Sequence, residues 1–290
     1  MMFDIPSRED ALKQEQEIKR MEMQMLEEDA EVDISETINQ PPIAISLGEK
    51  VFKTTRGVEK YTIPVGTYGN FSFIQAPPKS MKTYFIGILA SAYLKGTNGY
   101  AGEIKGHRDG EEVIHFDTEQ SKFHAQKVFR RPIDMNGSMD NGYHTYALRK
   151  MSFKDRISFI EYILYEKLNG KNIGLVIIDG VADLVSDVNN IVEANLVVQM
   201  LMKWTDELKC HIITVIHSNF GSDKPTGHLG SFLEKKTETQ ISLEKNTQNE
   251  GYVTASCKRS RSFPFEKITF KVNDRGLPEV LDLSHLNNLY

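Results

Sequence analysis

The sequence predicts an α/β protein in which helices cover both faces of a mainly parallel sheet, giving a three-layer αβα domain. Two segments, Ile173–Asp179 (IGLVIID) and His211–His217 (HIITVIH), are largely apolar and β-branched, and each follows a segment with helical spacing. Continuous apolar runs between helices are typical of parallel strands that are buried on both faces. After Gly230 strand-like segments follow one another without helices, which predicts a C-terminal antiparallel extension.

Each predicted element follows from the composition and spacing of a short segment. Good helix formers and apolar spacing predict helices at residues 82–95, 120–130, 153–168 and 191–208. Short apolar runs between turn residues predict strands at residues 71–75, 113–116, 173–179, 211–217, 238–243, 252–257 and 267–272. Pro41-Pro42 precedes all of them, so we expect a domain boundary there, with residues 1–40 as an N-terminal arm and residues 41–290 as the main domain.

Residues 1–40 form an acidic arm. They contain 12 Asp and Glu against 4 Lys and Arg, which gives −8 in a chain whose net charge is −5. The remaining residues therefore carry +3, so the overall acidity does not argue against a polyanionic ligand for the main domain. A helix over residues 11–30 would align Leu12, Ile18, Met21 and Met25 in a narrow apolar stripe. The arm is either a solvated tail or an element that docks on a neighbouring subunit.

Composition excludes several classes of protein. No apolar run approaches the roughly 18 residues of a membrane span, so we expect no membrane partner. The N-terminal residues lack the basic and apolar regions of a secretory signal. Cys210 and Cys257 are too few for a disulfide framework or a cysteine-based zinc site. We therefore expect a cytoplasmic protein from a reducing compartment.

The segment between the first predicted strand and the helix at 82–95 is similar to a phosphate-binding loop. It fits the pattern G-x-x-x-x-G-K-[S/T] with Ala76 and Met81 in the glycine positions. The candidate nucleotide-binding residues are Ala76, Pro77, Pro78, Lys79, Ser80, Met81, Lys82 and Thr83. The pattern places Lys82 at the β- and γ-phosphates and the Thr83 hydroxyl at Mg²⁺, beside the anion-favouring start of a helix. The alternative is a proline-containing surface turn, because a left-handed Met81 would cost roughly 1–2 kcal/mol.

Polar residues at the ends of three strands are further candidates. Asp179 ends a buried strand, where a carboxylate can hold the Mg²⁺ of a bound nucleotide. Glu119 follows the strand at 113–116 and could polarise the attacking water, while Asp117 could cap the next helix. His217 ends a third strand and could report γ-phosphate occupancy to the loop that follows. The structural alternatives are a first-turn helix acid for Glu119 and a capping residue for His217.

A basic cluster, CKRSRSF, lies late in the chain and contains Arg259 and Arg261. Basic runs are commonly solvated surface. An arginine that reaches the nucleotide of a neighbouring subunit, however, acts as an arginine finger and stabilises the charge of the transition state. Both interpretations remain open from the residues alone.

The order of five features along the chain resembles that of the RecA-fold family of hexamer-forming helicases. These features are the degenerate phosphate loop, FDTEQ, IIDG, the strand ending in histidine and the late arginine pair. The resemblance covers about residues 43–283 and is strongest to RepA-type plasmid replicative helicases and related mobile-element ATPases of Bacteroides-like bacteria. It implies a RecA-like domain that binds ATP and Mg²⁺. The resemblance implies that Lys82 and Thr83 bind phosphate and Mg²⁺ and that Asp179 also binds Mg²⁺. It implies that Glu119 is the catalytic base and His217 the sensor. Arg261 would be the arginine finger, with Arg259 as a second candidate for that role.

The function that these observations favour is an ATP-dependent DNA motor or DNA-remodelling ATPase that works as a homohexameric ring. The expected partners are single-stranded DNA and replication or mobilisation proteins. Loops at residues 183–193 and 220–228 would hold the DNA, with Lys224 on a phosphate, Phe220 stacked on a base and His228 as a further contact. The alternative is a nucleotide-binding regulator or assembly factor of a mobile element with little or no ATP turnover, which the missing loop glycines favour.

Overall fold

The computed structural model describes residues 8–55, 57–95, 102–219, 222–246 and 251–281. The chain divides into two compact units, Met1–Gln40 and Pro41–Tyr290. The first unit contains helix α1 (Arg8–Ala30), none of whose residues is buried. Within the ranges given, no helix has both the length and the apolar character needed to cross a membrane.

The described residues of the second unit form a nine-stranded sheet in the order β12-β11-β10-β9-β3-β8-β7-β5-β6. Its strands are β3 (Phe71–Ala76), β5 (Glu112–Asp117), β6 (Tyr143–Ala147), β7 (Ile173–Asp179), β8 (His211–His217), β9 (Thr239–Lys245), β10 (Tyr252–Ser260), β11 (Ile268–Val272) and β12 (Pro278–Leu281). From β9 to β6 neighbouring strands are parallel, whereas β10, β11 and β12 pair in antiparallel fashion. The predicted α/β class with a mostly parallel sheet is therefore confirmed.

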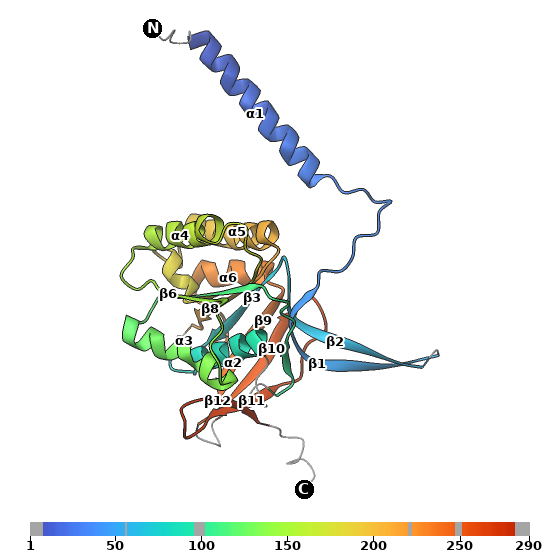
Figure 1. The fold of residues 1–290 in the computed structure, drawn as a ribbon, viewed down its shortest axis with the longest axis vertical. Coiled ribbons are helices and arrows are strands. Elements are labelled where there is room, and N and C mark those ends of the chain that lie inside the picture. Colours follow the sequence, from blue (N-terminus) through green and yellow to red (C-terminus); the bar gives the residue numbers. More distant parts are fainter. Residues whose placement is uncertain (1–7, 56, 96–101, 220–221, 247–250, 282–290) are drawn as a thin grey trace. The chain divides into compact units, whose positions relative to one another are not determined.

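Helices lie on both sides of this sheet. They are α2 (Lys82–Lys95), α3 (Lys122–Asn136), α4 (Phe153–Glu161), α5 (Ile191–Leu208) and α6 (Gly227–Lys236), with a π-helical turn at Tyr162–Lys167 and a 3₁₀ turn at Val181–Leu184. Figure 1 shows α2 and α3 on one side of the sheet and α4, α5 and α6 on the other. This arrangement is compatible with a three-layer α/β fold.

Alternate residues of the central strands face two different cores. In β7, Leu175 and Ile177 belong to the core that includes α2, while Val176 and Ile178 belong to the core that includes α4 and α5. Side chains alternate between the two faces of a strand, so a strand with helices on both faces favours apolar residues at most of its positions. This preference explains the uninterrupted apolar run IGLVIID.

The structure corrects three predicted elements. The strand predicted at 238–243 is β9, which pairs in parallel with β3, so the antiparallel extension begins only at β10. The helix predicted at 153–168 is α-helical to Glu161 and then continues as a π-helical turn. The helix predicted at 120–130 begins at Lys122 and continues through Pro132 to Asn136. Strand pairing and helix ends depend on partners that are remote in the sequence, and local composition does not specify them.

The sequence predictions missed several elements with mixed polar and apolar composition. Strands β1 (Ile43–Thr54), β2 (Gly57–Thr67) and β4 (Ile104–Gly106) form a second sheet in the order β2-β1-β4. Figure 1 shows the β1–β2 hairpin projecting beyond the main sheet. Strands β6 and β12 and helix α6 were also not predicted. The outer half of the hairpin is largely exposed, so its sequence lacks the apolar run that would identify a strand.

Candidate functional site

The candidate phosphate loop connects the end of β3 to the start of α2. Strand β3 ends at Ala76 and α2 begins at Lys82, so the loop lies at the carboxyl edge of the parallel strands. The hydroxyl of buried Ser80 donates a hydrogen bond of 2.5 Å to the carbonyl of Pro77, which closes the loop on itself. The first turn of α2 starts with N–H groups of Tyr84 and Phe85 that donate to the Met81 carbonyl. A helix N-terminus of this kind favours an anion.

Two loop residues have a left-handed backbone. Lys79 has φ 62° and Met81 has φ 61°, and among the described residues the only other non-glycine residue with positive φ is Lys209. The sequence left open whether Met81 would avoid the left-handed conformation. In the structure Met81 adopts it. It occupies the position of the second glycine in the phosphate-loop pattern, where the cost for another residue is roughly 1–2 kcal/mol. The loop therefore keeps a glycine-type backbone without the glycine.

Met81→Gly is expected to preserve the fold and to bind nucleotide at least as tightly as the parent protein. Glycine removes the steric cost of the left-handed backbone, although it also adds freedom to the unfolded chain. Isothermal titration with ATP analogues and a denaturant titration would measure both effects. Met81→Ala is the matched control, because it shortens the side chain but keeps the strain. Weaker binding by Met81→Gly than by Met81→Ala would contradict this account of the loop.

The ammonium group of Lys82 is largely withdrawn from solvent at the start of α2. The residue is 9% exposed. Its Nζ lies 3.3 Å from the Pro77 carbonyl oxygen and 3.0 Å from Nδ1 of His217. Burial lowers the pKa of Lys82, and the negative charges of Glu119 and Asp179 partly oppose this effect. Lys82 makes no ion pair with a described residue, and a desolvated ammonium of this kind is suited to receive an anionic ligand.

His217 connects Lys82 to Glu119. Its Nδ1 faces Lys82, while its Nε2 lies 3.4 Å from Oε1 of Glu119. The hydrogen bond from His217 is the main cause that lowers the pKa of Glu119, helped by the charges of His217 and Lys82 and opposed by desolvation. The N–H of Ser218 donates to the Ala76 carbonyl, which fixes the end of β8 beside the end of β3. Three predicted site residues are therefore brought together, and Glu119 is held in its ionised form.

Two aspartates meet at the ends of neighbouring strands beside this group. Asp117 of β5 and Asp179 of β7 are paired in the sheet register. Burial is the main cause that raises the pKa of Asp179 to about 8, and the nearby charges of Asp117 and Glu119 raise it further. One oxygen of each carboxylate, Oδ2, is buried and has no hydrogen-bond partner among the residues that the structure describes. A buried carboxylate oxygen of this kind is stabilised when it binds a cation or a proton.

The predicted helix-capping role of Asp117 is wrong. Its Oδ1 accepts hydrogen bonds from the backbone N–H groups of Glu119 and Gln120, at 3.0 and 2.8 Å. The N-cap position of α3 is occupied by Ser121, whose side chain makes no capping hydrogen bond, and α3 begins at Lys122. The turn between β5 and α3 is longer than the sequence suggested, so Asp117 stabilises this turn. It thereby sets the position of Glu119.

The donor set fits a hydrated Mg²⁺ ion. Carboxylate oxygens of Asp117 and Asp179 are available, and Thr83 lies in the first turn of α2. Mg²⁺ commonly takes one or two carboxylates and completes its shell with waters and substrate phosphates. In the described part of the chain no three His, Cys, Asp or Glu residues form a metal-binding group, so these residues would not make a protein-only metal cage.

Arg131 and Thr118 belong to the site but were not predicted. The guanidinium of Arg131 lies 3.7 Å from the centre of the Tyr84 ring, and its Nη1 is 3.4 Å from the Thr83 carbonyl oxygen. The Thr118 hydroxyl is 3.0 Å from the carbonyl oxygens of both Asp179 and Gly180, and 2.7 Å from Oδ2 of Asp183. These contacts join segments that are far apart in the sequence, and no local motif signals them.

The late arginines contact α6 instead of the Lys82 group, within the residues that the structure describes. Nη2 of Arg261 donates a hydrogen bond of 2.8 Å to the Lys236 carbonyl at the end of α6. Nη2 of Arg259 is 3.9 Å from Oε1 of Glu234. Arg261 is exposed, so its side chain can exchange this contact for another partner.

The residues predicted to contact DNA lie after β8. The carbonyl of Lys224 accepts a hydrogen bond from the Asn219 N–H, and His228 lies in the first turn of α6. Phe220 falls outside the described residues. The side chain of Gln75, the residue before Ala76, donates a 2.8 Å hydrogen bond to the Asp223 carbonyl. The loop is therefore attached to the strand that carries the phosphate loop.

Comparison of the sequence with known proteins found no matching family model and no significantly similar curated protein. The chemistry of the site must therefore be inferred from its own groups. A buried lysine at a helix N-terminus can bind phosphate oxygens. An ionised glutamate beside it can accept a proton from water, and two buried aspartates can hold a hydrated cation.

Proposed function

We propose that this protein is an ATPase that binds ATP with Mg²⁺ and uses its hydrolysis to move or remodel DNA. The observation that carries this proposal is the grouping of Lys82, His217 and Glu119 beside the paired acids Asp117 and Asp179. The charges of this group match the polyphosphate, the metal and the attacking water of phosphoryl transfer. The RecA-like assignment rests on the order of these residues along the chain.

Lys82 and the N–H groups at the start of α2 bind the β- and γ-phosphates and offset the charge that develops on them. Mg²⁺, when bound, would neutralise part of the charge of the phosphate oxygens. Thr83 and Asp179 are the residues that would hold it. Glu119 accepts a proton from the water whose oxygen attacks the γ-phosphorus, and the bond from this phosphorus to the β–γ bridging oxygen breaks. The leaving group is ADP.

His217 is positioned to link nucleotide occupancy to the loop that follows β8. In the structure Nζ of Lys82 donates a 3.0 Å hydrogen bond to Nδ1 of His217, so a phosphate that engages Lys82 would release His217. The backbone carbonyl of His217 receives hydrogen bonds from both the N–H and the hydroxyl of Thr226, at the far end of this loop. A change at His217 is therefore passed to the segment that we propose contacts single-stranded DNA through Lys224, Phe220 and His228.

Lys82→Ala is expected to remove most ATP binding, because it deletes the cation that faces the phosphates. Isothermal titration with a non-hydrolysable ATP analogue and Mg²⁺ would measure the loss. Lys203→Ala, which removes an exposed lysine of α5, is the matched control and should bind like the parent protein. Equal affinity in the Lys82 and Lys203 variants would show that the segment at 76–83 is not the phosphate loop.

A regulator that binds nucleotide with little turnover is the second candidate. Two observations favour slow ATP hydrolysis. The backbone is strained at Lys79 and Met81. In addition, Lys82 already contacts the Pro77 carbonyl and His217. Steady-state phosphate release, measured with and without single-stranded DNA, separates the two functions. Turnover stimulated by DNA supports the motor. Tight ATP binding without phosphate release supports the regulator.

A further inference from the structure

A buried amide side chain lies directly before the phosphate loop. Gln75 is the residue of β3 that precedes Ala76, and it is fully buried. Phe71 and Phe73 of the same strand belong to the core that includes α5 and α6, and residues two apart share a face of a strand. Gln75 therefore places an amide in an apolar core. Such a group costs free energy unless its N–H and carbonyl groups have hydrogen-bond partners.

A second buried amide, Gln240 of β9, pairs with the first. Nε2 of Gln240 donates hydrogen bonds of 2.8 Å to Oε1 of Gln75 and 2.9 Å to Oε1 of Glu234 on α6. Oε1 of Gln240 is buried and has no partner among the described residues. The amide thus uses its N–H groups and leaves its oxygen unpaired. A carboxylate only accepts hydrogen bonds, so Glu234 fixes this orientation of Gln240.

The orientation of Gln240 fixes that of Gln75 in turn. Because Oε1 of Gln75 faces Gln240, its Nε2 faces Asp223, to whose backbone carbonyl it donates a hydrogen bond of 2.8 Å. Asp223 lies between β8 and α6. A Gln75 amide turned the other way would lose its hydrogen bonds to both Gln240 and Asp223. The chain from Glu234 through the two glutamines therefore holds Asp223 by a directional hydrogen bond.

Asp223 has a second attachment, which is more exposed. Its carboxylate forms an ion pair with Lys258 of β10, at a register shift between Cys257 and Arg259 in the pairing of β10 with β9. A bulge of this kind redirects a side chain. The side chains of Asp223 and Lys258 are 58% and 29% exposed, and ion pairs between exposed groups contribute little to stability. The hydrogen bond from Gln75 is therefore the attachment that sets the position of Asp223.

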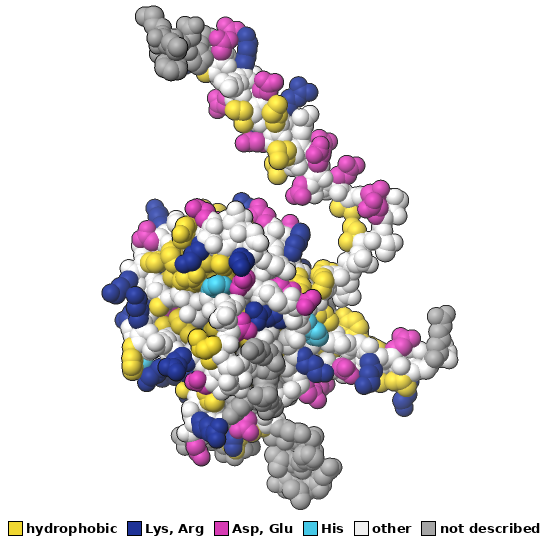
Figure 2. Space-filling model, in the orientation of Figure 1, with side chains coloured by type: hydrophobic (Ala, Val, Ile, Leu, Met, Phe, Trp, Pro, Cys, Tyr) yellow, Lys and Arg dark blue, Asp and Glu magenta, His cyan; other side chains and the backbone are white. Residues whose placement is uncertain are grey.

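The position of Asp223 determines that of Lys224, the next residue. On the face of the molecule shown in Figure 2, Lys and Arg side chains are interspersed with Asp and Glu. Charges of mixed sign give little extended attraction for a polyanion, so contact with DNA phosphates depends on where individual lysines lie. Gln75 thus connects a proposed DNA contact to the strand end from which the phosphate loop starts.

We propose that Gln75 is a positioning residue that couples residues 222–226 to the phosphate loop, so that single-stranded DNA on Lys224 and nucleotide on Lys82 change each other's affinity. The proposal rests on the proposed function, which supplies these two ligands. A shift of Asp223 on DNA binding moves the Gln75 amide, and the chain passes this movement directly to Ala76. Coupling between two sites is reciprocal, so each ligand must change the affinity of the other by the same factor. This route is separate from the one that starts at His217.

Binding measurements on the full-length protein test this coupling. The Kd of a non-hydrolysable ATP analogue with Mg²⁺ is measured with and without saturating oligothymidylate, and the Kd of labelled oligothymidylate is measured with and without the analogue. In the parent protein both should change by one factor, roughly 5–150, the range of allosteric coupling. Gln75→Met should bind each ligand alone and lose this factor, because methionine is similar in size but cannot donate a hydrogen bond to Asp223.

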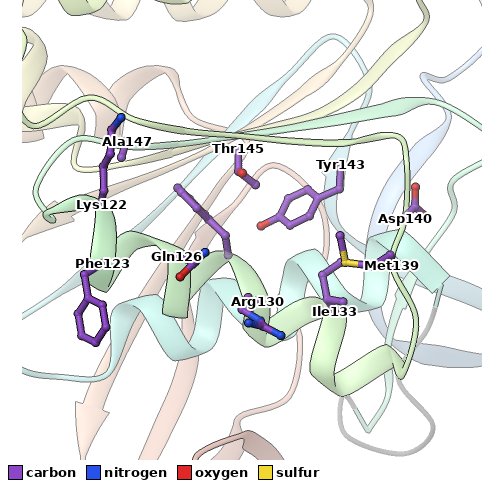
Figure 3. Close-up of a pocket in the computed structure, with 11 residues that line it drawn as sticks. Lys122, Phe123, Gln126, Arg130, Ile133, Met139, Asp140, Tyr143, Thr145 and Ala147 are labelled. Carbon is purple, nitrogen blue, oxygen red and sulfur yellow. The ribbon is translucent and has the colours of Figure 1, made fainter.

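Two control variants separate this hydrogen bond from other effects. Lys258→Ala removes the ion pair of Asp223 and leaves the bond from Gln75, so it should keep the coupling factor. Gln126→Met makes the same chemical change on α3, where Gln126 lines a groove of about 510 Å³ beside β6. Figure 3 shows Gln126 in this groove, and Figure 1 shows α3 on the side of the sheet opposite to α6. This variant should also keep the factor.

A double variant distinguishes coupling from support of the fold. Gln75→Met alone leaves the Asp223 carbonyl and an N–H of Gln240 without their partner, which should lower the melting temperature. Gln75→Met with Gln240→Met removes both amides, and replacing two hydrogen-bond partners by apolar groups can be nearly neutral. The double variant should regain most of the lost stability without regaining the coupling. Recovery of the coupling together with the stability would leave Gln75 with a structural role and overturn the proposal.

The remaining outcomes identify which proposal fails. An equal coupling factor in the parent and in Gln75→Met would overturn the role of Gln75 and leave the proposed function intact. A parent protein that binds the ATP analogue but no DNA would overturn both. Amide hydrogen exchange adds a measurement without DNA, in which the analogue alone should change exchange in residues 222–226 of the parent but not of Gln75→Met. Equal changes in the two proteins would contradict coupling through Gln75.

Discussion

Arg261→Ala is expected to bind ATP nearly as well as the parent protein and to hydrolyse it roughly 10³–10⁵ times more slowly, the range found for arginine fingers. The residue is exposed directly after β10 and donates to the Lys236 carbonyl, so its loss should leave the fold and the Lys82 group intact. Phosphate release under saturating ATP measures the effect. Arg275→Ala, in the turn between β11 and β12, is the matched control and should keep normal turnover.

Mixing the Arg261→Ala and Lys82→Ala proteins tests whether the finger acts between subunits. Each variant alone lacks one half of every site. In a mixed ring some interfaces pair an intact Lys82 with an intact Arg261 of the neighbour, so part of the activity should return. Hydrolysis by the parent protein as a dilute monomer, or no recovery although the subunits demonstrably exchange, would show that Arg261 does not act across an interface.

Glu119→Gln is expected to retain ATP binding and to slow hydrolysis by roughly 10²–10⁴, the range for loss of a general base. Glutamine is similar in size and can still hydrogen bond to His217, but it cannot hold the proton of the attacking water. Single-turnover phosphate release measures the chemical step, and titration with an ATP analogue measures binding. Glu244→Gln, an exposed substitution on β9, serves as the control. Normal hydrolysis by Glu119→Gln would leave Glu119 with a structural role only.

Much of the central sheet could be predicted because its strands are buried on both faces. The runs at 71–75, 173–179 and 211–217 correspond to β3, β7 and β8, and the helix predicted at 191–208 is α5. Burial on both faces favours apolar residues at most positions of a strand, so these elements are visible without a partner strand. Strands β1, β2 and β6 have an exposed face or edge, and their mixed composition concealed them.

The candidate site was predicted in part for the same reason. Lys82, Glu119, Asp179 and His217 lie next to strand or helix ends that the sequence located, and parallel strands bring their carboxyl ends to one edge. The positions of the late arginines, Arg259 and Arg261, relative to the site could not be predicted in this way. Their contacts with α6 depend on how β10 pairs with β9, which is a pairing between segments with no shared local pattern.

By itself the sequence determined the α/β class, the positions of the buried strands along the chain and which of them end in a charged or polar side chain, because these properties follow from local composition and from burial. Only the tertiary structure decided that β9 runs parallel to β3, that Met81 is left-handed, and that Asp117 faces Asp179. Each depends on packing between segments that are far apart in the chain. The free energy of that packing can hold a residue in a backbone conformation, or a carboxylate in a buried position, that it would not adopt alone.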